Sequence, residues 1–437
     1  MIVFENAKKR SSMPVRALAP VILALLAGLL ACVLCAKPSA ALPPGFVEER
    51  VASVFAPVAL DFTPDGRMVV ASKSGQLHVF DQNGTALASP ALNIGPKVCS
   101  GDTERGLLGV AVDPNFGQSG HNYVYVYYTF KKHGVCPDHK PANNNNPVNR
   151  VSRFAMSGNT VNENSEEVLI DNIPSPNGNH NAGDVKFGKD ELLYVSVGDG
   201  GCDYAEPKTC QYENDAARDR HILLGKVLRI TRTGDIPSGN PFTGSNSRRC
   251  NETGRTMRGN NCRETFAWGF RNPFRMAFDP DSTSTRFRIN DVGGARWEEI
   301  DRARAGADYG WNLCEGRHDN RERPGSVNCS GAGHTPPIYE YSHNTRLKCQ
   351  SVTGGAFVPN DSSLPNRYDN AYLFGDFVCN TIFSLTPKAG GGFRKELFAS
   401  VRDGGPIAMT FGPNGAEEVL YYTTFAKGGQ VRRITQV

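Results

Sequence analysis

The chain has 437 residues, with 46 glycines, 28 prolines and only 9% aromatic residues, a composition that suits many short strands joined by turns better than long helices. The formal net charge is +4, and the basic residues before Pro38, less Glu5, account for all of it. The remainder is close to neutral and has no basic run interleaved with aromatic residues, so nucleic acid is not expected as a partner.

The N-terminal segment has the layout of a secretory signal. Basic residues at positions 8–16 precede an apolar run at 17–36, and small residues and prolines follow. We expect cleavage after Ala41, which assigns residues 1–41 to the signal and 42–437 to one mature domain. Two alternatives remain open: the apolar run is about 20 residues long, enough for an uncleaved anchor, and Cys32 resembles a lipoprotein processing site. Each predicts an exported protein that contacts a membrane only through this segment.

The most informative feature of the remaining chain is a repeated hairpin pattern. An alternating apolar segment runs into a turn rich in Pro, Asp or Gly, and a second apolar segment follows. The six copies span residues 59–71, 109–126, 184–196, 276–289, 355–375 and 408–422. A single hairpin cannot bury its own apolar faces, so the repetition predicts an all-β fold, a six-bladed β-propeller. The alternative, a pair of β-sandwiches, does not account for repetition centred on turns.

Ten cysteines follow the signal, and an even number in an exported chain predicts disulfides. Their spacings match no zinc site. We expect pairing between neighbours in sequence: Cys99–Cys136, Cys202–Cys210, Cys250–Cys262, Cys314–Cys329 and Cys349–Cys379. Most lie in or beside long polar insertions, so the propeller is predicted to carry long, disulfide-stapled loops at one mouth. Sequons at Asn83, Asn251, Asn328 and Asn360 predict glycosylation.

Three segments could carry chemistry. His180 lies in the Gly/Asn loop 177–183 just before a predicted strand, where it could face the channel as a base or serve only a local hydrogen bond. Arg271 lies in the aromatic-rich segment 267–275, where it could grip an anion or satisfy loop carbonyls. The segment 291–300 offers carbonyl and carboxylate oxygens that suit calcium, or a solvated acidic turn.

Taken in order from about residue 45 to 434, these segments resemble the glucose/sorbosone dehydrogenase family. This family includes soluble quinoprotein glucose dehydrogenases, aldose sugar dehydrogenases and hedgehog-interacting protein-like proteins. The resemblance rests on ERGLLG (104–109), the His180 loop, YVSVGDGG (194–201), GKVLRI (225–230), GFRNP (269–273), WEEI (297–300), DYGW (308–311), TGG (353–355) and YLFGDF (372–377).

The resemblance implies a propeller that holds pyrroloquinoline quinone over its channel and oxidises aldoses. His180 matches the base that takes the proton of the anomeric hydroxyl, and Arg271 with Asn272 matches the pair that contacts the quinone and the reacting oxygen. Glu104 matches a polar cofactor contact. Asn179 stands where similar enzymes commonly have an acidic residue beside the histidine.

The resemblance also implies two calcium ions. Gly293 and Gly294 match positions whose carbonyls hold the calcium that polarises the quinone, and Glu299 and Tyr309 fall near a second, structural calcium. One part of the family pattern is missing: Val378, Gly405 and Ile407 occupy positions where a Lys and two Arg neutralise the cofactor's carboxylates. Arg402 is the nearby cation that could compensate.

These observations predict an extracellular quinoprotein oxidoreductase whose partners are a small sugar and an external electron acceptor. The alternative is a non-catalytic propeller, like the hedgehog-interacting relatives, that binds protein or carbohydrate. A calcium-dependent lactonase or esterase is a third class, but no ring of metal-binding carboxylates supports it.

Overall fold

The computed structural model describes residues 42–437 except 89, 138–145, 205–209, 326–327, 332 and 402–403. The predicted signal or anchor at 1–41, and Arg402, lie outside the described residues. Within the described ranges no helix is long and apolar enough to cross a membrane, and the regular structure is β-sheet with a few short 3₁₀ turns.

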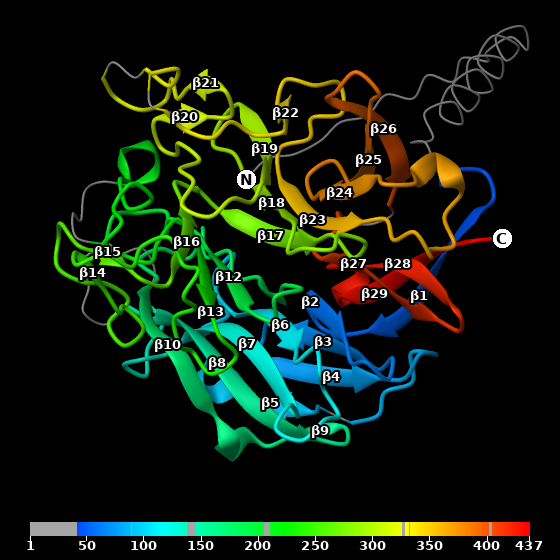
Figure 1. Cartoon of the computed structure of the whole chain (residues 1–437). Helices are drawn as coiled ribbons and strands as arrows, with labels where there is room; N and C mark the ends of the chain where they lie inside the picture. Colours follow the sequence, from blue (N-terminus) through cyan, green and yellow to red (C-terminus); the bar gives the residue numbers. More distant parts are fainter. Residues whose placement is uncertain are drawn as a thin grey trace, which may run out of the picture. The chain divides into compact units, whose positions relative to one another are not determined.

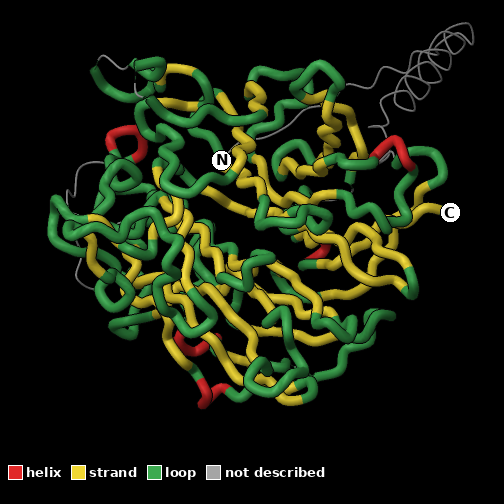
Figure 2. The backbone as a smooth tube through the Cα atoms, in the orientation of Figure 1, coloured by secondary structure: helices red, strands yellow, loops and turns green. Residues whose placement is uncertain are grey.

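Six antiparallel sheets form the blades of a propeller (Figures 1 and 2). From the innermost strand outwards, blade 1 contains β2 (Pro57–Phe62), β3 (Met68–Ser72), β4 (Gln76–Phe80) and β5 (Leu92–Asn93). Blade 2 contains β6 (Leu107–Val112), β7 (Tyr123–Phe130), β8 (Val148–Ser157) and β10 (Glu167–Pro174), with β9 (Thr160–Val161) on β8. Blade 3 contains β11 (Val185–Phe187), β12 (Leu193–Val197), β13 (Lys226–Ile230) and β16 (Thr265–Trp268).

Blade 4 contains β17 (Pro273–Phe278), β18 (Phe287–Asp291), β19 (Trp297–Arg302) and β22 (Tyr339–Ser342). Blade 5 contains β23 (Val352–Phe357), β24 (Tyr372–Asp376), β25 (Thr381–Pro387) and β26 (Phe393–Ser400). Blade 6 contains β27 (Met409–Asn414), β28 (Glu417–Thr424), β29 (Gln430–Gln436) and β1 (Phe46–Ser53). Two short ladders, β14 (Ser247–Arg248) with β15 (Asn261–Cys262) and β20 (Cys314–Glu315) with β21 (His318–Asp319), lie in long loops.

The ring is closed by pairing the two ends of the described chain. Phe46 of β1 pairs with Gln436 of β29, so the last blade combines one strand from the start with three from the end (Figure 1). This closure leaves no open edge between the first and last blades.

The predicted hairpins are the two innermost strands of the six blades, and the predicted six-bladed all-β fold is confirmed. Each sheet packs against blades on both sides, which explains why β6 is buried along its whole length. Val69 and Val79 of blade 1, for example, share a core cluster with Val110 and Val126 of blade 2. Packing near the channel is tight: a Cβ on Gly109 of β6 would lie 2.1 Å from the carbonyl oxygen of Gly183.

All five predicted disulfide pairs are present. They join short or medium stretches of loop, with sequence separations from 8 to 37 residues. Such cross-links restrain loops that sheet pairing does not order. Glycosylation of the four sequons stays a prediction.

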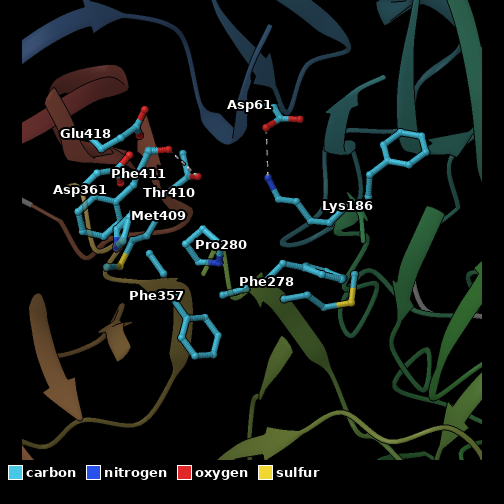
Figure 3. A pocket seen from close by; sticks show the side chains of 16 residues that line it. Asp61, Lys186, Phe278, Pro280, Phe357, Asp361, Met409, Thr410, Phe411 and Glu418 are labelled. Carbon is cyan, nitrogen blue, oxygen red and sulfur yellow. Dashed lines mark hydrogen bonds and ion pairs between the residues drawn. The ribbon is translucent and has the colours of Figure 1, made fainter. Parts of the chain in front are cut away.

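The innermost strands run in the same direction through the ring. Hydrogen bonds join the segments that precede β6, β11 and β17 at one face. At the other face the ends of the innermost strands surround a cavity of about 440 Å³ (Figure 3). There Asp61 and Lys186 face one another with 3.9 Å between Oδ1 and Nζ. The chemistry-bearing residues found by sequence therefore gather at the face from which the innermost strands start.

Candidate functional site

A buried histidine and a buried aspartate form the centre of the site. His180 lies in the loop before β11, and its Nδ1 is 2.7 Å from Oδ1 of Asp199, which follows β12. His180 is 6% exposed and Asp199 is fully enclosed. Since a carboxylate can only accept a hydrogen bond, Nδ1 of His180 donates and carries the proton. In the neutral imidazole the lone pair is then on Nε2, to which no described residue hydrogen-bonds, so this arrangement leaves Nε2 able to accept a proton.

Asp199 is itself held by several donors. The indole Nε1 of Trp311 donates to Oδ2 at 2.8 Å, and the backbone N–H of Gly201 donates to Oδ1 at 2.8 Å. The backbone N–H of Asp199 donates to the carbonyl of Arg271 at 2.8 Å. These contacts fix the carboxylate, which in turn fixes the ring orientation and tautomer of His180.

The His180 loop has an unusual backbone. His180 and Ala182 have φ values of 53° and 48°, in the left-handed region that non-glycine residues seldom adopt. The residue that follows β12 is packed tightly against this loop, because a Cβ on Gly198 would lie 2.1 Å from the carbonyl oxygen of His180. Such strain persists only where the surroundings hold it, and it is common at functional sites.

Asn272 and Glu104 tie this loop to two other blades. The Nδ2 of Asn272 donates to both carboxylate oxygens of Glu104, at 3.2 and 3.1 Å. Glu104 also accepts the backbone N–H of Asn181 at 3.0 Å, and Oδ1 of Asn272 accepts the N–H of Ala182 at 3.1 Å. Asn272 is 2% exposed. The structure thus places both residues beside His180, where they hold its loop from either side.

Arg271 lies next to this group and is only partly committed. Its Nη1 donates to the carbonyl of Val292 at 3.0 Å, and its guanidinium lies 5.5 Å from the ring centroid of Trp311. Its Nε is buried, and no described residue accepts a hydrogen bond from it. Nη1 thus satisfies a loop carbonyl, which is one of the two roles expected from the sequence, and Nε is left without an acceptor among the described residues.

Asn179, the neighbour of His180, contributes a second unsatisfied group. Its Oδ1 is buried and has no hydrogen-bond donor among the described residues. A buried polar atom without a partner is rare in a folded protein and often marks a ligand position. Its location beside His180 fits a contact with a bound group.

The loop of Gly293 and Gly294 directs its amides into the protein. Four successive backbone N–H groups, from Gly294 to Trp297, donate to Oε1 of Glu315 at 2.8 to 3.1 Å. The N–H of Gly293 donates to Glu298 at 3.2 Å. No described residue donates to the carbonyl oxygens of Gly293 and Gly294. Free carbonyl oxygens are what calcium binds, so the donor set fits the predicted ion.

The region of Glu299 holds three buried carboxylates. Asp291 and Glu299 are cross-strand partners on β18 and β19, and Asp301 lies two residues further along β19. Burial raises the pKa of Glu299 and of Asp301 well above their ordinary values, and the neighbouring carboxylates raise both further. Both oxygens of Asp301 are buried without a hydrogen-bond donor. A cation beside Glu299 and Asp301 would relieve this repulsion, so these two carboxylates are the candidates to hold the predicted calcium ion.

Tyr309 lies near enough to this acidic group to interact with the charge of Asp301. It is 3% exposed and stacks on Phe270 with 4.4 Å between ring centroids. Its hydroxyl donates to the carbonyl of Arg302, and the charge of Asp301 adds to burial in raising its pKa above the ordinary value.

The three positions that lack the family's cations differ from one another. Val378 is half exposed, at 50%. Ile407 is 2% exposed and belongs to the core cluster of blades 1 and 2. A Cβ on Gly405 would lie 2.3 Å from the backbone of Phe377. Only position 378 could therefore present a side chain to a ligand without rebuilding the local packing.

Sequence reasoning assigned no role to Asp199, Trp311 or Asp301. Asp199 and Trp311 lie within the YVSVGDGG and DYGW segments, so the signal was present as a motif. The contact of Asp199 with His180 spans 19 residues and that of Trp311 with Asp199 spans 112, and only the fold shows them.

Comparison with known proteins identifies the family of the chain. Residues 54–407 match the model of the glucose/sorbosone dehydrogenase family. The HIPL2 protein of Arabidopsis thaliana is 27% identical over 378 residues, 75% of this chain and 51% of that protein. Aldose sugar dehydrogenase YliI of Escherichia coli K12 is 26% identical over 259 residues, 59% of each chain. The chain spans about half the length of the Arabidopsis relatives it matches.

Among solved structures, the PQQ-bound form of aldose sugar dehydrogenase from Streptomyces coelicolor resembles the chain with a TM-score of 0.64. The two are 21% identical, and the match covers 90% of this chain and 99% of the other. At this identity the likeness concerns the fold.

Proposed function

Because the chain belongs to the glucose/sorbosone dehydrogenase family, we propose that it is an exported oxidoreductase that oxidises an aldose-type sugar. Its cofactor is pyrroloquinoline quinone with calcium, and an external acceptor takes the electrons. The observation that carries this proposal is the buried pair of His180 and Asp199. An imidazole held by a fully enclosed carboxylate in strained backbone is costly to build, and it gives Nε2 the orientation of a base.

The chain's own residues have distinct tasks in this reaction. Nε2 of His180 takes the proton of the anomeric hydroxyl, and Asp199 stabilises the imidazolium that results. Arg271 offers its unpaired nitrogen to the substrate oxygen or the cofactor, and Glu104 and Asn272 keep the His180 loop in place. The chemistry that the quinone would supply when bound is that of a hydride acceptor. Carbonyl oxygens of Gly293 and Gly294 would hold the calcium beside it.

The residues fit one end of the cofactor better than the other. His180, Arg271 and the unsatisfied oxygen of Asn179 would hold the reacting end. The end that carries carboxylates lacks cations at Val378, Gly405 and Ile407. Each charge-assisted contact is worth about 1.5 to 3 kcal/mol, so we expect weak cofactor binding relative to the glucose dehydrogenases.

This missing charge favours a second candidate function, a non-catalytic propeller that binds protein or carbohydrate. The two candidates share the fold and the family and differ in whether the cofactor binds. Export is part of both proposals. The five disulfides support it, since such bonds persist in oxidising compartments.

One experiment separates the candidates. Purified protein is titrated with pyrroloquinoline quinone and calcium, binding is followed by quenching of tryptophan fluorescence, and dye reduction is measured with a panel of aldoses. Saturable binding with sugar-dependent dye reduction is expected. His180→Ala should lower turnover by at least about a hundredfold while cofactor binding persists. If the quinone does not bind, the oxidoreductase proposal is wrong and the binding propeller stands.

A further inference from the structure

A second cavity, of about 680 Å³, lies between blades 4 and 5. Its walls include Arg288 and Arg302 from blade 4 and Phe357, Lys388 and Phe393 from blade 5. Arg288 is three residues before Asp291 on β18, about 10 Å back along the strand from the His180 site. The cavity is therefore separate from the site described above, and its volume is in the range of small-molecule pockets.

Arg288 is the unusual residue of this cavity. It is 9% exposed, and its Cζ lies 4.8, 4.5 and 4.8 Å from the ring centroids of Phe357, Tyr372 and Phe393. Its Nη1 is buried without a hydrogen-bond acceptor, and no described carboxylate forms an ion pair with it. The aromatic rings compensate part of the cost of burying this charge. They offer no hydrogen-bond acceptor in the plane of the guanidinium, so the buried Nη1 stays unsatisfied.

A second arginine stands directly opposite. Arg288 on β18 pairs in register with Arg302 on β19, so the two side chains emerge side by side on one face of the sheet. Like charges at such positions repel, and burial together with the charges of Arg286 and Arg302 lowers the pKa of Arg288 to about 10. Lys388 adds a further cation to a wall that also carries Arg286 and the carboxylates of Asp279, Asp281 and Asp369. Neither Arg302 nor Lys388 is paired with a described carboxylate, whereas the nearby Arg286 is satisfied by Asp279.

We propose that this cavity binds a small polyhydroxylated carboxylate, an acidic sugar of the uronate type. The carboxylate would sit between Arg288 and Arg302, where it accepts the unsatisfied guanidinium hydrogen bonds and removes the repulsion between the two charges. Phe357 and Phe393 supply apolar surface for one face of the ring. Asp369 and Asn370 supply acceptors and a donor for hydroxyl groups at the rim.

The proposal does not depend on the cofactor or on catalysis, so it is tested by direct binding. Isothermal titration of the folded protein with glucuronate should give saturable binding, and neutral glucose at the same concentration should give none. Arg302→Gln and Lys388→Gln should each weaken glucuronate binding by about tenfold or more. Both side chains are exposed, so these variants should fold normally, and thermal melting verifies that.

Two further variants make the result specific. Arg394→Gln removes an equally charged, exposed side chain on β26 that does not line the cavity and should leave the affinity unchanged. His180→Ala should also bind glucuronate normally, because its site is separate. Absence of glucuronate binding, or equal affinity in Arg302→Gln and the wild type, overturns the proposal. Equal binding of inorganic sulfate and glucuronate would overturn the sugar assignment, since the rim and ring contacts would then contribute nothing.

Discussion

Nδ1 of His180 and Oδ1 of Asp199 are 2.7 Å apart, in a pocket where the carboxylate is fully enclosed and receives two more hydrogen bonds, from Trp311 and Gly201. These hydrogen bonds restrain the carboxylate, and the carboxylate in turn restrains the orientation of the histidine ring. This relationship decides which nitrogen faces the ligand, and it can be tested without altering the shape of the site.

Asp199→Asn should nearly abolish sugar oxidation in protein reconstituted with quinone and calcium. The amide can donate to Nδ1, which favours the tautomer with the proton on Nε2 and removes the base. Related substitutions in histidine–aspartate catalytic pairs cost about 10⁴-fold in turnover, and a loss of at least about 10²-fold is expected here. Steady-state dye reduction measures the effect, with cofactor binding followed in parallel.

The chain offers a matched control for this substitution. Asp113 and His121 form another pair, 2.9 Å apart, in blade 2 away from the site. Asp113→Asn makes the same chemical change and should leave turnover unaffected. If both variants lose activity equally, or if Asp199→Asn keeps full turnover, the role given to Asp199 is wrong.

The fold was predictable because its information is local and repeated. In each blade the sequence pattern of the two innermost strands predicts a hairpin. Six such hairpins in one chain leave few possible folds other than a closed ring of blades. The disulfides followed the same logic, since neighbours in sequence paired. Asp199 and Asp301 were not assigned because their meaning depends on distant partners. The alternation of side chains along β19 (WEEIDR) places Glu299 and Asp301 on the same side of the strand. It does not show that both are buried beside Asp291 of the neighbouring strand. Arg288 was missed for the same reason.

Asp301→Asn should remove a calcium dependence of stability. Both carboxylate oxygens are buried without donors, and burial together with Asp291 raises the pKa of Asp301 well above its ordinary value. Calcium should therefore raise the melting temperature of the wild type, by the equivalent of about 3 kcal/mol at a hundredfold excess over its Kd. In Asp301→Asn the shift should vanish, and the calcium-free variant should be at least as stable as the calcium-free wild type.

Scanning calorimetry with calcium or chelator measures both, and the exposed Asp361→Asn is the control. An undiminished calcium shift in Asp301→Asn would contradict the assignment.

Lys226 should give the protein a characteristic pH dependence. This buried lysine on β13 donates to the carbonyls of Ala216, Ala217 and Leu224, and burial lowers its pKa to about 7. Between about pH 7 and pH 10 the native state therefore holds fewer protons than the unfolded state, so the free energy of unfolding rises with pH through this window.

Lys226→Met should flatten that rise. The variant loses three hydrogen bonds and should be less stable at every pH, but its stability should climb less steeply, by up to about 1 kcal/mol per pH unit. Urea unfolding at several pH values measures the slope, and the exposed Lys388→Met is the control for adding a methionine. Parallel curves for wild type and Lys226→Met would show that the buried amine does not titrate in this window.

Val378→Lys should strengthen quinone binding. Of the three positions that lack the family's cations, Gly405 is closed by the backbone of Phe377 and Ile407 is committed to the core, while Val378 is half exposed. A lysine there restores one charge-assisted contact to a cofactor carboxylate, worth about 1.5 to 3 kcal/mol, which corresponds to at least about tenfold in Kd. Leu397→Lys is the matched control, because that residue is 52% exposed on β26 and gains the same charge away from the site.

Tighter binding in Val378→Lys alone would show that the carboxylate end of the cofactor is oriented as in the dehydrogenases and that its binding is weakened only by the lost charge. Equal affinities in all three proteins would mean that position 378 does not face the cofactor, and the argument for weak binding from missing cations would fail with it.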